Sequence, residues 1–117
     1  KNMKKVYHLG KCTTCQRILE ELNWDEKTQE IRSEKITEKQ LNEMAILAGS
    51  YEALFSRKAI KYKTMKLKEK TLSEADYKQL ILEEDTFLNR PVFLIDGAIF
   101  IGNTKKTVEA VQAALHE

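Results

Sequence analysis

The segment from Arg90 to Gly102, RPVFLIDGAIFIG, constrains the fold more than any other part of the chain. Two apolar tetrads are separated only by Asp96-Gly97, a dipeptide typical of a two-residue β-hairpin turn. Neither tetrad alternates with polar residues, which is the pattern of strands that are buried on both faces. The segment therefore predicts a buried hairpin in a sheet that helices cover on two sides. Pro91 stands at the start of the first strand, where a missing N–H costs least.

The rest of the chain alternates between strand-like and helix-like patterns. Residues 4–10, KKVYHLG, predict a first strand, and residues 28–33, TQEIRS, predict a short second one. Apolar residues at helical spacing predict helices over residues 12–22 and 38–48 and a closing helix from Thr104. A capping box at residues 37–40 begins the second of these helices, and a capping signal at residues 73–76 begins a further one. Ser50 opens another helix through residues 51–55. This order predicts a single α/β domain over residues 1–117.

Composition and charge exclude several classes of protein. A net charge of +2 is too balanced for a typical nucleic-acid binder, although residues 57–70 are rich in lysine. No apolar run approaches the ~20 residues that span a bilayer, and the first residues lead into too short an apolar stretch for a signal peptide. Secreted domains of this size that depend on disulfides carry more cysteine. We therefore expect a cytoplasmic protein without a direct nucleic-acid or membrane partner.

The only two cysteines form the motif Cys12-x-x-Cys15. A disulfide between them would close too small a loop to stabilise the fold appreciably. A structural zinc site needs four ligands, and with one histidine at the C-terminus and no second Cys-x-x-Cys the set is incomplete. The motif therefore predicts no metal site and favours thiol chemistry.

Cys12 follows a strand and a loop and stands at the start of a helix, where unpaired N–H groups and the helix dipole stabilise a thiolate. Lys11 adds a neighbouring cation, and His8 could add another or donate a hydrogen bond; His8 could equally be an ordinary strand residue. Cys15 is one turn away and could attack an adduct on Cys12. It also lies on the apolar stripe, so it could instead be a small core residue.

The same helix start is a candidate oxyanion site, because its N–H groups point at the ligand. Lys11 beside Cys12 could contribute to this site, and two arginines could complete it: Arg57 in LFSRKAIKY and Arg90 in LNRPVF. Either could also be a solvated surface residue.

Three segments together, VYHLGKCTTCQRILEEL, YEALFSRKAIKY and LNRPVFLIDGAIFIGN, resemble the arsenate reductase family of the glutaredoxin-coupled type, which includes Spx-type transcriptional regulators and small uncharacterised relatives. The resemblance implies a thioredoxin-like fold, a four-stranded mixed sheet flanked by helices with a helical insertion before the C-terminal hairpin. It implies that Cys12 is the nucleophile, that His8 matches a histidine of the preceding strand, and that Arg57 and Arg90 bind the oxyanion. It also implies that Pro91 is an active-site cis-proline.

Two positions depart from the family pattern. Cys15 stands where the glutaredoxin-coupled enzymes usually have serine and the Spx type has cysteine. A third arginine expected after the last strand is replaced by Gly102-Asn103-Thr104.

The resemblance implies a thiol oxidoreductase that uses Cys12 on arsenate, another small oxyanion or an oxidised thiol. The implied electron donor is glutathione or glutaredoxin, with thioredoxin if Cys15 takes part, and no bound cofactor is needed. One alternative is an Spx-like regulator whose Cys12–Cys15 disulfide controls binding to RNA polymerase. Another is a glutathione-dependent reductase of some other small substrate.

Overall fold

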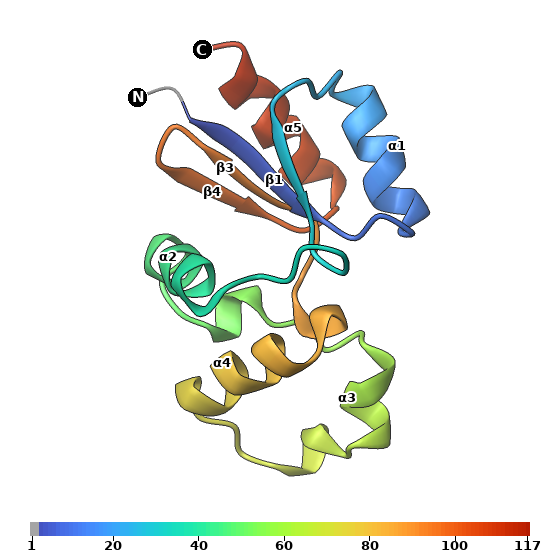
Figure 1. The fold of residues 1–117 in the computed structure, drawn as a ribbon, viewed down its shortest axis with the longest axis vertical. Coiled ribbons are helices and arrows are strands. Elements are labelled where there is room, and N and C mark those ends of the chain that lie inside the picture. Colours follow the sequence, from blue (N-terminus) through green and yellow to red (C-terminus); the bar gives the residue numbers. More distant parts are fainter. Residues whose placement is uncertain (1–2) are drawn as a thin grey trace. The chain divides into compact units, whose positions relative to one another are not determined.

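The computed structural model describes residues 3–117, which form two compact units. The first contains the chain up to Lys35 together with Arg90–Glu117, and the second contains Ile36–Asn89. Figure 1 shows the ribbon of both. The expectation of a single domain over residues 1–117 stays a prediction.

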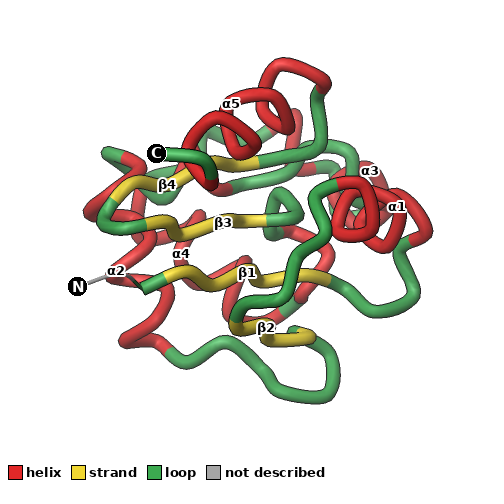
Figure 2. The backbone as a smooth tube through the Cα atoms, turned by 90° about the horizontal axis from the view of Figure 1, so that it is seen from above, coloured by secondary structure: helices red, strands yellow, loops and turns green. Residues whose placement is uncertain are grey.

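The first unit is built on a four-stranded mixed sheet. Its strands are β1 (Lys4–His8), β2 (Lys27–Glu30), β3 (Val92–Ile95) and β4 (Ala98–Ile101), in the spatial order β2-β1-β3-β4. β1 pairs parallel with β2 and antiparallel with β3, and β3 pairs antiparallel with β4 (Figure 2). The predicted hairpin and the predicted mixed sheet are confirmed.

Helices α1 (Thr13–Glu21) and α5 (Lys105–Leu115) pack on one face of this sheet. The apolar spacing of each helix supplies the contacts, because residues three and four apart lie on one face of a helix. The core cluster consists of Val6, Ile18, Leu22, Phe93, Ile95 and Val111, each at most 5% exposed. Thr104 caps α5 by accepting a hydrogen bond from the Thr107 N–H, as the sequence predicts.

Two strand predictions were wrong in detail. The apolar run of Ala98–Ile101 predicted a strand buried on both faces, but β4 is an edge strand with Ala98 exposed and the other three residues half-buried. An apolar run reports hydrophobicity but carries no information on which strand lies at the edge. The second strand ends at Glu30, and residues 31–33 form a turn that the sequence assigned to the strand.

The second unit is the predicted helical insertion between β2 and β3. It contains α2 (Glu38–Ala48), α3 (Ile60–Thr64) and α4 (Glu74–Glu83), with 3-10 turns at Glu52–Leu54, Leu67–Glu69 and Asp85–Phe87. Both capping boxes are confirmed, and Gly49 ends α2 in the left-handed region at φ 97°. The helix expected from Ser50 is only a 3-10 turn, in which the Ser50 hydroxyl accepts a hydrogen bond from the Ala53 N–H.

Aromatic side chains hold the second unit together. The Phe55 ring stacks on Phe87 at a centroid distance of 5.0 Å and meets Tyr77 edge-on at 4.9 Å. Such pairs contribute about 0.5–1.5 kcal/mol beyond the area they bury. No helix within residues 3–117 has the length and apolar character that crossing a membrane requires.

Candidate active site

Cys12 is the N-cap residue of α1. The loop from β1 turns back at once, since the Cys12 N–H donates to the Leu9 carbonyl at 3.0 Å. Its Sγ atom then accepts a hydrogen bond from the Cys15 N–H at 3.4 Å, the position that a serine or aspartate oxygen takes in an ordinary N-cap. The sequence prediction that Cys12 stands at the start of a helix is confirmed.

This position makes the Cys12 thiol acidic. Partial burial raises its pKa, but hydrogen bonds from the backbone and thiol of Cys15, the charge of Arg90 and the Thr14 N–H together outweigh burial. The pKa of Cys12 therefore lies below its ordinary value. A larger fraction of thiolate, the nucleophilic form, is present at neutral pH than in an unperturbed cysteine.

Cys15 has the opposite environment. It is fully buried on the inner side of α1, and burial together with its hydrogen bond to Cys12 raises the pKa of its thiol to about 11. Both cysteines are free thiols in the structure. Cys15 is therefore a protonated thiol that is hydrogen-bonded to Cys12. This environment is compatible both with a core residue and with a resolving thiol.

Strand pairing brings Arg90 to the same place. Tyr7 of β1 pairs with Val92 of the antiparallel β3, so the residues just before β3 lie beside those just after β1. The positive charge that lowers the pKa of Cys12 is accordingly that of Arg90. The Arg90–Pro91 peptide bond is cis, the state that the resemblance implies for this proline.

His8 is the last residue of β1 and is 8% exposed. Strand alternation places it on the same face as Val6, the face that α1 and α5 cover. Burial lowers the pKa of its imidazole, and the nearby charge of Glu30 only partly opposes this. The lowered pKa disfavours a second cation near Cys12, and the catalytic role of His8 stays a prediction. Its Nδ1 is buried without a hydrogen-bond partner among residues 3–117.

The two remaining candidates are Lys11 and Arg57. Lys11 is exposed in the loop before Cys12. Arg57 belongs to the second unit, where its guanidinium donates to the Glu52 carboxylate at 2.9 Å and to the Tyr77 hydroxyl at 3.0 Å. Oxyanion binding by Lys11, Arg57 and Arg90 stays a prediction.

Sequence reasoning missed two residues that fix the loop before Cys12. The Glu30 carboxylate accepts a hydrogen bond from the Gly10 N–H at 3.0 Å, and the Gln16 amide donates to the Gly10 carbonyl at 3.1 Å. No sequence signal marks either residue, because their partners are backbone groups. Glu30 is also 20 positions away in the chain.

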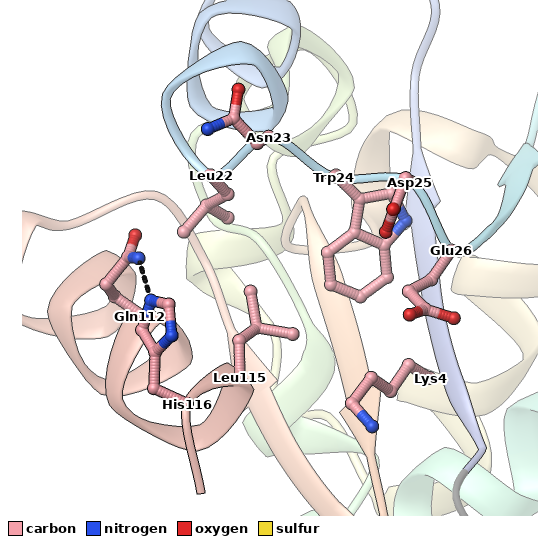
Figure 3. Close-up of a pocket in the computed structure, with 9 residues that line it drawn as sticks. All are labelled: Lys4, Leu22, Asn23, Trp24, Asp25, Glu26, Gln112, Leu115 and His116. Carbon is pink, nitrogen blue, oxygen red and sulfur yellow. Dashed lines mark hydrogen bonds between the residues drawn. The ribbon is translucent and has the colours of Figure 1, made fainter.

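A pocket of about 270 Å³ lies at the other end of β1 (Figure 3). Its lining includes Lys4, Trp24, Leu115 and His116, and none of the predicted site residues. Within residues 3–117, no three His, Cys, Asp or Glu side chains group closely enough to hold a metal ion.

The comparisons with known proteins agree with this geometry. The model of the ArsC family matches residues 7–111, which is most of the chain and includes both cysteines and Arg90. The chain belongs to the ArsC family. Comparison with curated protein sequences finds no match.

Solved ArsC-type structures share the fold. An arsenate reductase from Vibrio cholerae is 18% identical with a TM-score of 0.76, and the match covers 97% of this chain and 98% of that one. An arsenate reductase (ArsC) related protein from Brucella melitensis is 19% identical with a TM-score of 0.71, covering 92% of each chain. The thioredoxin-like fold expected for an ArsC family member is thus confirmed.

Proposed function

We propose that this ArsC family protein is a thiol oxidoreductase that uses Cys12 as its nucleophile on arsenate or a related small oxyanion. The observation that carries the proposal is the Cys12 thiol itself, which caps α1 and has a lowered pKa beside Arg90. Family membership adds the expectation of arsenate chemistry, and the Vibrio cholerae neighbour is described as an arsenate reductase.

In the proposed first step the Cys12 thiolate attacks arsenic(V), and a sulfur–arsenic bond replaces an arsenic–oxygen bond as hydroxide or water leaves. Cys12 is partly exposed, so a small anion can reach it. The Arg90 guanidinium and the N–H groups at the start of α1 would hold the remaining oxygens. Lys11, exposed in the loop before Cys12, would add a further cation to this site within the first unit, and oxyanion binding by Arg57 stays a prediction. The absence of a third arginine at Gly102-Asn103-Thr104 predicts weaker arsenate binding than in relatives that have it.

In the second step a thiol attacks the Cys12 sulfur. The Cys12–arsenic bond breaks, its electron pair remains on arsenic, and arsenite leaves as the two thiols become a disulfide. The attacking thiol is glutathione, regenerated through glutaredoxin, or Cys15, regenerated by thioredoxin. Attack by Cys15 is intramolecular, which favours it over a free thiol. The thiols must return to the reduced state after each turnover, which suits a reducing compartment such as the cytoplasm.

The adjacency of the two cysteines supports a second candidate, a regulator of the Spx type. The Cys15 thiol donates to the acidic Cys12, so oxidation of Cys12 would leave a second thiol next to it. A Cys12–Cys15 disulfide could then act as a redox switch for binding RNA polymerase. A glutathione-dependent reductase of another small substrate is the third candidate.

An arsenate reductase assay with glutathione and glutaredoxin tests the proposal. We expect arsenite formation by the wild-type protein and none by Cys12→Ser. Cys15→Ser should keep this activity if glutathione resolves the adduct, and should lose activity with thioredoxin if Cys15 does. The regulator would replace the enzyme as our proposal if the wild-type protein reduces arsenate neither with glutathione and glutaredoxin nor with thioredoxin, but binds RNA polymerase in an oxidation-dependent way.

Intact mass after mild peroxide tests the disulfide separately. We expect a species lighter by two hydrogens that dithiothreitol reverses, whereas Cys15→Ser should accumulate sulfenic acid or a glutathione adduct at Cys12. If no mild oxidant produces the internal disulfide, Cys15 is a core residue.

A further inference from the structure

Glu30, at the end of β2, is a partly buried carboxylate that accepts four hydrogen bonds. Its Oε2 atom accepts hydrogen bonds from the N–H groups of Gly10 and Arg32, both at 3.0 Å. Its Oε1 atom accepts from the Ser33 N–H at 3.0 Å and the Ser33 hydroxyl at 2.8 Å. The N–H groups of Gly10 and Arg32, followed by the Ser33 hydroxyl, lower the pKa of Glu30 to about 2. The group is therefore charged at neutral pH and joins two separate backbone segments.

The fit between Glu30 and Gly10 is close. A β-carbon placed on Gly10 would lie 2.9 Å from Cγ of Glu30 and 3.3 Å from its Cδ. The first distance is shorter than real Cβ contacts allow, so a side chain at position 10 would displace the carboxylate. A side chain at position 10 and the Glu30 carboxylate in its observed position therefore exclude each other.

The Gly10 peptide groups are held from two sides. Glu30 accepts from the Gly10 N–H, and Gln16 of α1 donates to the Gly10 carbonyl at 3.1 Å. Cys12 follows two residues later, and its own N–H is bonded to the Leu9 carbonyl within the same loop. The position of Cys12 at the start of α1 thus depends on the position of the Gly10 backbone.

We infer that Glu30 is a positioning residue for the Cys12 thiolate, acting through its hydrogen bond to the Gly10 backbone. The inference rests on the proposed function, in which Cys12 is the reacting group. Loss of the Glu30 contact would leave the Gly10 N–H without its acceptor and loosen the loop. The 3.4 Å hydrogen bond from the Cys15 N–H to Cys12 Sγ would then be made less often.

A positioning role and a purely electrostatic role of Glu30 predict different shifts in the pKa of Cys12. A negative charge near a thiol disfavours the thiolate, so neutralising Glu30 by charge alone would leave the pKa of Cys12 unchanged or lower it. If Glu30 instead positions the loop, its loss removes hydrogen bonds that stabilise the thiolate, and the pKa of Cys12 rises. The sign of the shift therefore separates the two roles.

The experiment is the pH profile of Cys12 alkylation by iodoacetamide, followed by mass spectrometry, in Glu30→Ala and Glu30→Asp. Glu30→Asp keeps the charge but is one methylene too short to reach the same donors. Both variants should raise the pKa of Cys12 by about one pH unit. At a pH below the Cys12 pKa of wild type and variant, this corresponds to about tenfold less thiolate. Glu34→Ala is the matched control, because Glu34 is an exposed carboxylate four residues further on, and it should leave the profile unchanged.

Gly10→Ala gives an independent test through a double-mutant cycle. Alone it should raise the pKa of Cys12, since its methyl group displaces the carboxylate, and in the Glu30→Ala background it should add little. Circular dichroism shows whether Glu30→Ala folds. If it does not, the Gly10→Ala single variant takes its place in the test. An unchanged or lowered pKa in the folded Glu30 variants, or full additivity with Gly10→Ala, overturns the inference. The assay measures thiol acidity without turnover, so a wild type that is inactive on arsenate would overturn the proposed function alone.

Discussion

At the scale of single residues, two cysteines three positions apart have opposite acidities. The pKa of Cys12 is lowered at the start of α1, whereas that of Cys15 is raised to about 11 in the core of the first unit. The asymmetry arises because Cys12 Sγ accepts hydrogen bonds from the N–H and the thiol of Cys15, whereas the Cys15 thiol is a donor in a buried site. In the proposed reaction, Cys12 would be the attacking thiol and Cys15 the candidate resolving thiol.

The first prediction concerns this asymmetry. Iodoacetamide should label Cys12 with a midpoint below the unperturbed ~8.5, and should leave Cys15 unlabelled in the folded protein at neutral pH. Peptide mapping across pH 5–10 measures both sites at once, with Cys12→Ser as the control for labelling elsewhere. Equal labelling rates at the two cysteines would contradict the structure.

The second prediction concerns Arg90, whose charge contributes to the low pKa of Cys12. Arg90→Ala should raise that pKa and weaken the protection of Cys12 by sulfate or phosphate by about 1.5–3 kcal/mol, the range for hydrogen bonds to charged groups. Arg17→Ala is the control, because Arg17 is an exposed cation on α1 that pairs with Glu21 at 3.1 Å. Equal anion protection in wild type and Arg90→Ala would rule out Arg90 as an oxyanion ligand.

At the scale of elements, the two strands of the hairpin differ although their sequences look alike. Phe93 of β3 is fully buried and belongs to the core cluster, whereas Phe100 of β4 is half-buried at its margin. These two residues pair directly across the strands. A central strand has neighbours on both sides and an edge strand has one, so the same apolar residue buries less area in β4.

The third prediction follows from this difference. Phe93→Ala should lower the free energy of unfolding by about 3–5 kcal/mol, because it leaves a cavity in a closed core. Phe100→Ala should cost clearly less, since part of the ring is already in contact with solvent. Urea unfolding followed by circular dichroism gives both values, and a Phe100→Ala cost equal to that of Phe93→Ala would show that β4 is buried after all.

At the scale of the whole molecule, stability should depend on acid through carboxylates that the fold holds ionised. The pKa of Glu30 is lowered to about 2 by its four hydrogen-bond donors. Hydrogen bonds to partner groups also lower the pKa of three carboxylates in the second unit, Glu38, Asp76 and Glu84. A carboxylate whose folded pKa is depressed stabilises the protein above its unfolded pKa, and this contribution disappears as pH falls toward the folded pKa.

The fourth prediction uses Glu30 to test this dependence. Between the unfolded glutamate pKa of ~4.3 and about pH 2, wild-type stability should fall with decreasing pH, and Glu30→Gln should show a shallower fall in that window. The fall should persist in part, because the other three carboxylates remain. Urea midpoints at a series of pH values measure the slope, with Glu34→Gln as the control. Identical slopes in wild type and Glu30→Gln would show that Glu30 is not held ionised by folding.

The sequence by itself determined the features that depend on neighbours in the chain. Capping boxes begin α2 and α4, Asp96-Gly97 turns the hairpin, and Cys12 caps α1, all because each pattern acts over a few residues of backbone. The family resemblance added the thioredoxin-like topology, which the mixed sheet confirms.

Only the tertiary structure decided the features that join distant segments. It places β4 at the sheet edge, sets the charge of Arg90 beside Cys12, and lowers the pKa of His8 by burial. It also brings the Glu30 carboxylate to the Gly10 N–H, a backbone group that every residue except proline carries. A side chain that binds such a group leaves no mark in the sequence of its partner, and proximity across 20 positions is set by strand pairing, which no local pattern encodes.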